Sequence, residues 1–198
     1  MSTQMNEGHV HDCDQTRKKF NLVMQVCNRP EKLFEIGFQG GHSTRMLLDM
    51  FPDMKIHSID ICEYDYTERL GNELAEENEN FTFQNISSLD LTVDDLEGYD
   101  AVFVDGGHDE VSVENDIQLC INANIRYIIV DDYKKNFKEL VNITNNKVRS
   151  NNYHWFGDKI PYICMDDKRQ IINTLRIIVR SDLIPTYPEK VQKLFTKE

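Results

Sequence analysis

Residues 33–44 read LFEIGFQGGHST, and this stretch decides the fold. It begins as a short apolar strand that reaches Glu35, passes through a glycine-rich turn, and opens a helix at residues 42–44. A strand that runs through such a turn into a helix directs free backbone N–H groups and the positive end of the helix dipole at one place. The stretch therefore predicts a binding place for a nucleotide-like ligand at this turn.

A second strand is expected at residues 55–60, KIHSID, and it ends in an acid. Asp60 lies 20 residues after Gly40, which is about the spacing at which a carboxylate can accept hydrogen bonds from ribose hydroxyls. Strand, glycine turn, helix, strand and acid together form one βαβ unit.

The same alternation continues along the chain. Apolar periodicity predicts strands at 81–86, 99–105 and 126–133, and helices at 15–27, 44–51, 66–80 and 111–123. Such alternation indicates an α/β fold, a Rossmann-like, doubly wound and mostly parallel sheet with helices on both faces. We expect about seven strands, the last of them forming a C-terminal antiparallel hairpin.

The C-terminal third is less regular. A helix is expected at 137–148, and strands at 153–156 and 161–165 around a turn at Gly157-Asp158. Residues 170–179, QIINTLRIIV, fit a helix or a strand, because a short apolar run does not decide between them, and we favour a strand for the second half.

Composition and charge limit the classes of molecule that this protein is expected to bind. The formal net charge of −12 opposes binding of nucleic acid, and the start of the chain lacks the plan of a signal peptide. No apolar run approaches the ~20 residues that a membrane span needs. The five cysteines are scattered singly, which fits neither a disulfide framework nor a zinc site. We expect a cytoplasmic protein with a small-molecule partner and no membrane contact, and the sequence leaves a homo-oligomer open.

Acids stand at the ends of the strands expected at 99–105 and 126–133, namely Asp105, Asp131 and Asp132. Neighbouring parallel strands lie ~4.8 Å apart, so these carboxylates can converge on one hard cation such as Mg²⁺. The competing interpretation is that Asp131-Asp132 caps the next helix and that DGGH at 105–108 is a tight turn. Their common position at one sheet edge favours the metal.

Four segments in order carry a family resemblance: FEIGFQGGHST at 34–44, IHSID at 56–60, YDAVFVDGGHDEVSVENDI at 99–117 and YIIVDDY at 127–133. They resemble the class I S-adenosylmethionine-dependent methyltransferases. Within these, they resemble most the small metal-dependent O-methyltransferases of the sugar and macrolide type, in which one strand ends in Asp-Gly-x-His and the next in Asp-Asp-Tyr. The resemblance covers residues 30–133.

The resemblance implies a role for each matching residue. Glu35 and Gly37 would lie against the methionine part of S-adenosylmethionine, and Asp60 would hold its ribose. The other implied contacts with this cofactor are Gly40, Gly41, Ser43, Ser87, Ser88 and Asp105, the two serines lying by the adenine. Asp105, Asp131 and Asp132 would bind a divalent metal, with Asp105 and His108 in the catalytic group. Gln39 departs from the family, which commonly has glycine at this position.

These implications lead to one methyltransferase domain over residues 1–198. It would have a loose N-terminus at 1–12, a cofactor-binding core at 13–133, and a part at 134–198 that shapes the acceptor pocket. The expected activity is methylation of a hydroxyl on a small acceptor, preferably a sugar or glycan. Two alternatives stay open, a non-catalytic cofactor-binding module and a dinucleotide-dependent oxidoreductase. Gln39 argues against the oxidoreductase, because a dinucleotide site wants glycine there.

Overall fold

The carboxyl ends of five parallel strands form one edge of a single sheet in the computed structural model, which describes residues 9–134, 136–166 and 169–197. In these residues the sheet order is β1-β7-β8-β6-β5-β2-β3-β4, and β9 pairs with β7. Parallel pairing joins the five strands β4, β3, β2, β5 and β6, whereas β8 and β7 run antiparallel to their neighbours. The strands are β1 (His9–Val10), β2 (Lys32–Ile36), β3 (Lys55–Asp60), β4 (Phe81–Asn85), β5 (Ala101–Val104), β6 (Tyr127–Val130), β7 (Tyr153–Asp166), β8 (Arg169–Arg180) and β9 (Phe195–Thr196).

The order of the strands reverses at β2, which lies between β3 and β5. In an open α/β sheet, ligands bind in the crevice at such a reversal, outside the carboxyl ends of the strands. The glycine turn that follows β2 therefore stands at the expected binding position.

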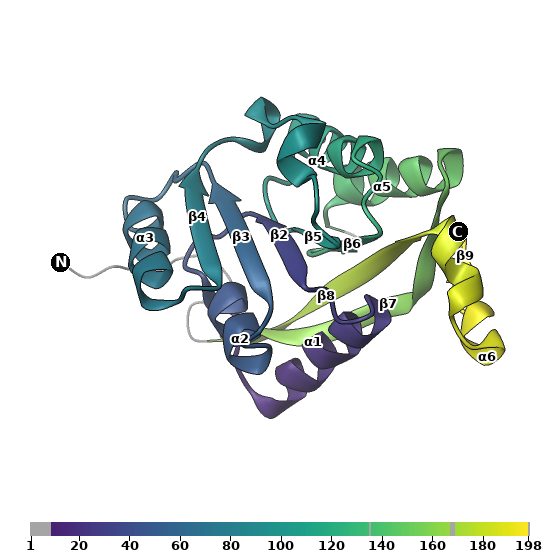
Figure 1. Ribbon diagram of the computed structural model, residues 1–198, viewed down its shortest axis with the longest axis horizontal. Coiled ribbons are helices and arrows are strands. Elements are labelled where there is room, and N and C mark those ends of the chain that lie inside the picture. The colour runs from purple at the N-terminus through teal and green to yellow at the C-terminus, as the bar shows by residue number, and fades with distance from the viewer. Residues whose placement is uncertain (1–8, 135, 167–168, 198) are drawn as a thin grey trace.

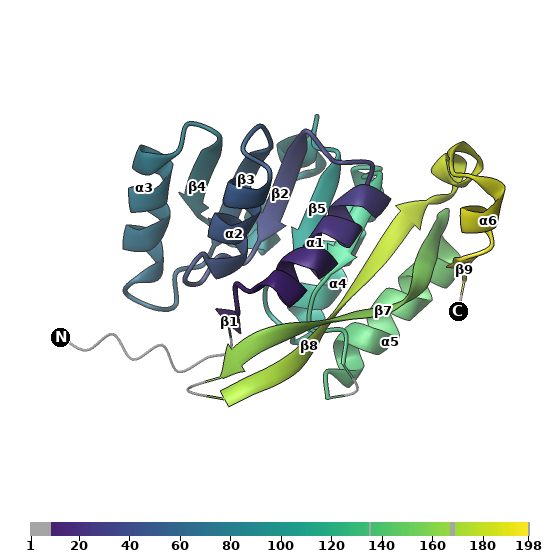
Figure 2. The ribbon, with the colours of Figure 1, turned by 90° about the horizontal axis from the view of Figure 1, so that it is seen from below.

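Helices cover both faces of the sheet. In Figure 1, α4 and α5 lie along its upper side and α1 and α2 along its lower side, and Figure 2 gives the view from below. Side chains of β5 alternate between the two layers: Phe103 joins the core under α1 and α2, whereas Val102 and Val104 join the core under α4 and α5. The helices are α1 (Asp14–Val26), α2 (His42–Met50), α3 (Thr67–Glu77), α4 (Glu110–Asn122), α5 (Lys138–Ser150) and α6 (Glu189–Gln192). The predicted doubly wound, mostly parallel sheet is confirmed.

The C-terminal hairpin is longer than the sequence predicts. Residues 153–156 and 161–165 belong to one strand, β7, so the predicted turn at Gly157-Asp158 is wrong. The register against β8 shifts between Phe156 and Ile160, and Gly157 has a φ of +55°. The glycine therefore marks a bulge inside a strand. Pairing of β8 with both β6 and β7 makes 169–180 a strand throughout.

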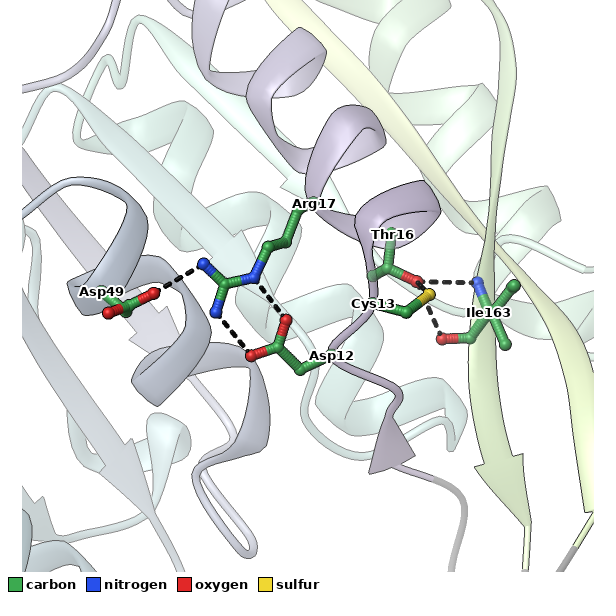
Figure 3. A network of polar contacts seen from close by, with 6 residues as sticks. All are labelled: Asp12, Cys13, Thr16, Arg17, Asp49 and Ile163. Carbon is green, nitrogen blue, oxygen red and sulfur yellow. Dashed lines mark hydrogen bonds and ion pairs between the residues drawn. The ribbon is translucent and has the colours of Figure 1, made fainter.

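The N-terminal segment is also more ordered than predicted. Residues 1–8 of the expected loose end lie outside the described residues, but His9 and Val10 pair with Met165 and Cys164 of β7. Figure 3 shows two further tethers nearby: Arg17 contacts Asp12 and Asp49, and Thr16 contacts the backbone of Ile163. The predicted loose end therefore becomes a strand at its C-terminal part.

In the ranges given above, no helix is long and apolar enough to cross a membrane.

Candidate active site

The glycine turn after β2 passes very close to the end of β5. Gly37 has a φ of +96°, and a Cβ at this position would lie 2.1 Å from the backbone oxygen of Asp105. A side chain would separate the ends of the two strands, so glycine is required here. The contact brings the turn and the first of the three predicted acids together.

Asp60 holds this turn from the end of β3. Its Oδ2 accepts hydrogen bonds from the backbone N–H groups of Phe38 and Gln39, at 2.8 and 2.9 Å, and its Oδ1 accepts from Cys62 at 2.8 Å. Oδ2 thus uses both of its lone pairs, whereas Oδ1 keeps a second one, so one acceptor position of the carboxylate remains. Asp60 both shapes the turn and faces the cavity beside it.

Glu35 lies behind the turn in the layer between β2 and α2. Its side chain is fully buried, and it accepts hydrogen bonds from Ser43 at 3.1 Å, from Thr44 at 2.6 Å and from Ser58. Burial raises the pKa of this carboxyl, although the three hydroxyl donors oppose that shift. Glu35 thus joins the first turn of α2 to β3.

A cavity of about 550 Å³ opens along the carboxyl edge of the sheet. Most of the residues predicted to form the site line it: Gly37, Gly40, Ser43, Asp60, Ser87, Ser88, Asp105, His108, Asp131 and Asp132. Glu35 and Gly41 are not among the cavity-lining residues that the structure describes. The ends of β2 to β6 thus bring ten predicted residues from separate segments into one cavity.

Three carboxylates meet at one end of this cavity. Asp105, Asp131 and Asp132 each offer an oxygen, and these oxygens lie within 4.8 Å of one another. Asp131 Oδ2 accepts a hydrogen bond from the Tyr162 hydroxyl at 2.6 Å, whereas its buried Oδ1 has no hydrogen-bond partner among the described residues. An acceptor oxygen left buried and unpartnered costs free energy unless a ligand satisfies it.

The protonation of these acids depends on their surroundings. Burial, and then repulsion from the other two carboxylates, raises the pKa of Asp105 well above its usual value. Burial and the charge of Asp132 raise the pKa of Asp131 to about 7. Burial also acts to raise the pKa of Asp132, but hydrogen bonds from His108 and Lys134 outweigh it and lower that pKa. Asp132 is thus the acid of the three that stays ionised most readily.

His108 lies beside Asp132. Its Nε2 is 3.2 Å from Asp132 Oδ2, and its ring stacks on Phe137 with the ring centroids 4.1 Å apart. Asp132 adopts a φ of +50°, which is uncommon for a residue other than glycine, and its other oxygen is 2.8 Å from Lys134 Nζ. The turn after β6 therefore holds the Asp132 carboxylate between the His108 ring and the Lys134 ammonium group.

Other residues that line the cavity are not among the predicted site residues. His9 and His42 stack with their ring centroids 4.3 Å apart, and burial lowers the pKa of His42 to about 4. Tyr162 and Asn173 come from β7 and β8. The register of β7 against β8 makes Tyr162 and Asn173 neighbours. A turn at Gly157, as predicted from the sequence, does not give this register, so the sequence does not predict their contact.

Residues 34–133 match a family model described as a methyltransferase domain. No curated protein sequence matches the chain. The O-methyltransferase TomG from Streptomyces achromogenes, solved in complex with SAM, is 18% identical with a TM-score of 0.62, over 86% of this chain and 82% of TomG.

Two other solved structures are similar to the same extent. An O-methyltransferase from Bacillus cereus in complex with SAH is 14% identical with a TM-score of 0.58, over 87% of this chain and 84% of that one. Cofactor-bound Rv0187 from MTB is 17% identical with a TM-score of 0.60, over 87% of this chain and 82% of that one. At such identities the likeness to these solved structures shows the fold alone. The family model spans half of the chain, and this match shows the family. The chain therefore belongs to the methyltransferase-domain family and has its class I fold.

Proposed function

We propose that this protein is an S-adenosylmethionine-dependent O-methyltransferase that methylates a hydroxyl of a small acceptor, a sugar or a glycan, assisted by a divalent metal such as Mg²⁺. One observation carries the proposal: the glycine turn with Asp60 and the three carboxylates line the same cavity. The binding site for the methyl donor and the site that would activate the acceptor hydroxyl would thus lie in one cavity.

The order of the strands supports the position of the donor. Along the sheet edge, Ser87 and Ser88 follow β4, Asp60 ends β3, Gly37 follows β2 and Asp105 follows β5. Strands lie about 5 Å apart, so an extended ligand can meet these residues in turn. Adenine beside the serines, ribose beside Asp60 and the methionine part beside Gly37 would bring the methyl group toward Asp105. TomG was solved with SAM and the Bacillus cereus protein with SAH, which supports the same donor here.

The three acids fit a divalent metal. All their donor atoms are carboxylate oxygens, which Mg²⁺ prefers, and Asp131 Oδ1 is buried without a protein partner among the described residues. Asp105, Asp131 and Asp132 would hold the ion. When bound, a divalent cation lowers the pKa of a nearby hydroxyl and fixes its oxygen.

His108 would accept the proton of the acceptor hydroxyl. With its Nε2–H donated to Asp132, the Nδ1 atom remains as the base, and Asp132 stabilises the imidazolium that results. The methyl carbon leaves the donor sulfur as it bonds to the acceptor oxygen, and the proton passes to His108. Alignment of oxygen, carbon and sulfur in the cavity supplies the rest of the rate.

The acceptor class follows from the charge and size of the cavity. With a divalent cation bound, the three carboxylates still leave one negative charge, which disfavours an anionic acceptor, and polar side chains suit one with several hydroxyls. A volume of about 550 Å³, shared with the donor, suits a small molecule or the end of a glycan. We propose a neutral sugar, used in the cytoplasm, with no nucleic-acid partner, in keeping with the net charge of −12.

A methyl-transfer assay tests the proposal. The protein is incubated with S-adenosylmethionine and a panel of neutral sugars, and mass spectrometry follows the demethylated donor and the methyl ether. Removal of metal with EDTA should stop turnover, and Mg²⁺ should restore it. Asp131→Asn and Asp132→Asn should abolish turnover, whereas the exposed acid Asp94 serves as a matched control through Asp94→Asn. Turnover that persists in EDTA and in both variants would remove the metal from the mechanism.

The role of His108 has its own test. His108→Asn should lower kcat by roughly 10²–10⁴-fold, the usual worth of a positioned general base, with the affinity for S-adenosylmethionine unchanged. An unchanged kcat would mean that a group other than His108 accepts the proton of the acceptor hydroxyl.

The same assay separates the remaining alternative. A non-catalytic module would bind the donor and release no product with any acceptor. The presence of the complete acid cluster and of His108 in one cavity favours the enzyme, because a binding module has no use for a base beside the acids. The family match favours methyl transfer over the dinucleotide-dependent oxidoreductase.

A further inference from the structure

Asp131 is held by two residues of the C-terminal hairpin. The Tyr162 hydroxyl donates to Asp131 Oδ2 at 2.6 Å, and Asn173 Nδ2 donates to the Tyr162 oxygen at 2.8 Å and lies 3.5 Å from Asp131 Oδ2. All three side chains are buried, with exposed fractions of 1% for Tyr162, 3% for Asp131 and 5% for Asn173. The contacts therefore form a closed chain of hydrogen bonds away from bulk water.

The hairpin fixes the direction of this chain. Tyr162 on β7 and Asn173 on β8 are paired residues in the antiparallel register. The backbone N–H of Thr174 donates to Asn173 Oδ1 at 2.8 Å, so the amide nitrogen is the atom turned toward the tyrosine. With its oxygen supplied by Asn173, the phenol directs its only proton at Asp131.

The consequence for Asp131 concerns which oxygen faces the cavity. Oδ2 is occupied by the phenol, whereas Oδ1 is buried without a partner among the described residues. Asp131 lines the same cavity as Tyr162 and Asn173, next to Asp105 and Asp132. A carboxylate fixed through one oxygen presents the other in a defined direction, as a metal ligand must.

We propose that Tyr162 and Asn173 are positioning residues that present Asp131 Oδ1 to a divalent cation. This inference rests on the proposed function, because it assigns residues outside the acid cluster to the metal of that cluster. It gives the C-terminal hairpin a role in metal affinity. This hairpin lies outside residues 30–133, the part of the chain that contains the family motifs. Tyr162 acts directly on Asp131, and Asn173 acts chiefly through Tyr162, since its own contact with Asp131 Oδ2 is longer, at 3.5 Å.

Binding of Mn²⁺ alone to the full chain, followed by EPR or calorimetry, tests the inference without a requirement for turnover. Tyr162→Phe should weaken Mn²⁺ binding about 10–100-fold, the usual effect of losing a partner of a metal ligand. Its affinity for S-adenosylmethionine should stay unchanged, since Asp131 is not expected to touch the donor.

A matched control comes from the same strand. Tyr153 is also buried, and its hydroxyl donates to the backbone oxygen of Ile125 at 2.8 Å. Tyr153→Phe loses an equivalent hydrogen bond and should leave Mn²⁺ binding as it is. An equal loss of Mn²⁺ affinity in Tyr162→Phe and Tyr153→Phe would mean that Tyr162 only supports the hairpin, and it would overturn the inference.

A double-mutant cycle separates positioning from general support. Asn173→Ala should weaken Mn²⁺ binding less than Tyr162→Phe, and the double variant should bind little worse than Tyr162→Phe alone, because Asn173 acts chiefly through the phenol and its direct contact with Asp131 is long. Additive losses would contradict that path.

The outcomes distinguish this inference from the proposed function. Asp131→Asn should abolish Mn²⁺ binding if the acid cluster is the metal site. Mn²⁺ that binds equally to the unsubstituted protein and to Tyr162→Phe would overturn the positioning role and leave the metal site standing. Failure of the unsubstituted protein to bind Mn²⁺ would overturn both the metal and this inference, while donor binding could still be measured.

Discussion

At the scale of single residues, three acids of the same edge differ in the groups that surround them. Glu35 accepts from three hydroxyls and lies behind the cavity, and Asp60 accepts from three backbone N–H groups while facing it. Asp131 has one oxygen satisfied and one buried without a partner among the described residues. Of these three acids, Asp131 alone has a buried oxygen with no hydrogen-bond partner among the described residues, which is a position that a ligand would satisfy.

Gly37 provides a stability prediction. A Cβ there would meet the Asp105 backbone at 2.1 Å, whereas at Gly157, whose φ of +55° is also positive, a Cβ would meet nothing within 4 Å. Gly157→Ala should therefore cost only the backbone strain of about 1–2 kcal/mol. Gly37→Ala adds the clash and should lower the free energy of unfolding by more than ~3 kcal/mol. Urea denaturation measures both, and equal losses would contradict the close approach of the turn to β5.

Asp116 provides a pH prediction. This residue of α4 is buried, and burial raises its pKa from 3.8 to about 6, in spite of hydrogen bonds from Ser88 and Asn115. Because the pKa is higher in the folded state, the unfolded chain loses its proton first, and stability falls as the pH rises from about 4 to about 6. The neutral variant Asp116→Asn lacks this loss.

The measurement is the free energy of unfolding of both proteins from pH 4 to pH 8. The variant should gain on the unsubstituted protein by up to ~3 kcal/mol between pH 4 and pH 6, with no further gain above that range. A difference that stays constant with pH would show that Asp116 ionises as freely in the folded protein as in the unfolded chain.

At the scale of elements, the N-terminal segment and the C-terminal hairpin meet over the cavity. His9 and Val10 of β1 line it and pair with β7, whose Tyr162 and Cys164 also line it. A two-residue strand pairs weakly, so its position depends on the tethers in Figure 3. Arg17 bridges Asp12, just after β1, to Asp49 of α2.

Arg17→Ala tests this tether. Loss of both ion pairs should loosen β1, so hydrogen exchange at residues 9–11 should become a few-fold faster, while the remaining bonds to Ile163 limit the effect. Exchange is followed by mass spectrometry of an N-terminal peptide. Arg69→Ala removes an exposed ion pair to Glu73 within α3 and should leave this peptide unchanged. Unaltered exchange in Arg17→Ala would mean that pairing with β7 and the Thr16 contact hold β1 alone.

The sequence predicts the elements of the core and the helix at 138–150 well and the C-terminal hairpin poorly, for a physical reason. The strands β5 and β6 are continuous apolar runs buried on both faces, and an acid follows each of them, so their identity and the site at their ends follow from local pattern. β7 contains a glycine and a proline, Gly157 and Pro161, and its continuity depends on pairing with β8. Tyr162 and Asn173 become neighbours only through that register, and β1 forms only because β7 offers an edge.

At the scale of the whole molecule, one edge of the sheet gathers every group that the proposed reaction needs. Along this edge Ser87 and Ser88 lie at one end, Asp60 and the turn after β2 in the middle, and the three carboxylates with His108 at the other end. Helices on both faces bury the strands, so the ends of β2 to β6 are held in a fixed order. The spacing of donor and acceptor sites is thus a property of the sheet rather than of any single loop.

The proposed function requires this edge of the sheet to bind S-adenosylmethionine, and calorimetric titration of the full chain with that ligand measures this binding. We predict saturable binding well below millimolar concentration, with the demethylated donor competing for the same site and a nicotinamide dinucleotide showing no binding. Absence of heat from S-adenosylmethionine at millimolar concentration, or equal binding of the dinucleotide, would contradict the claim.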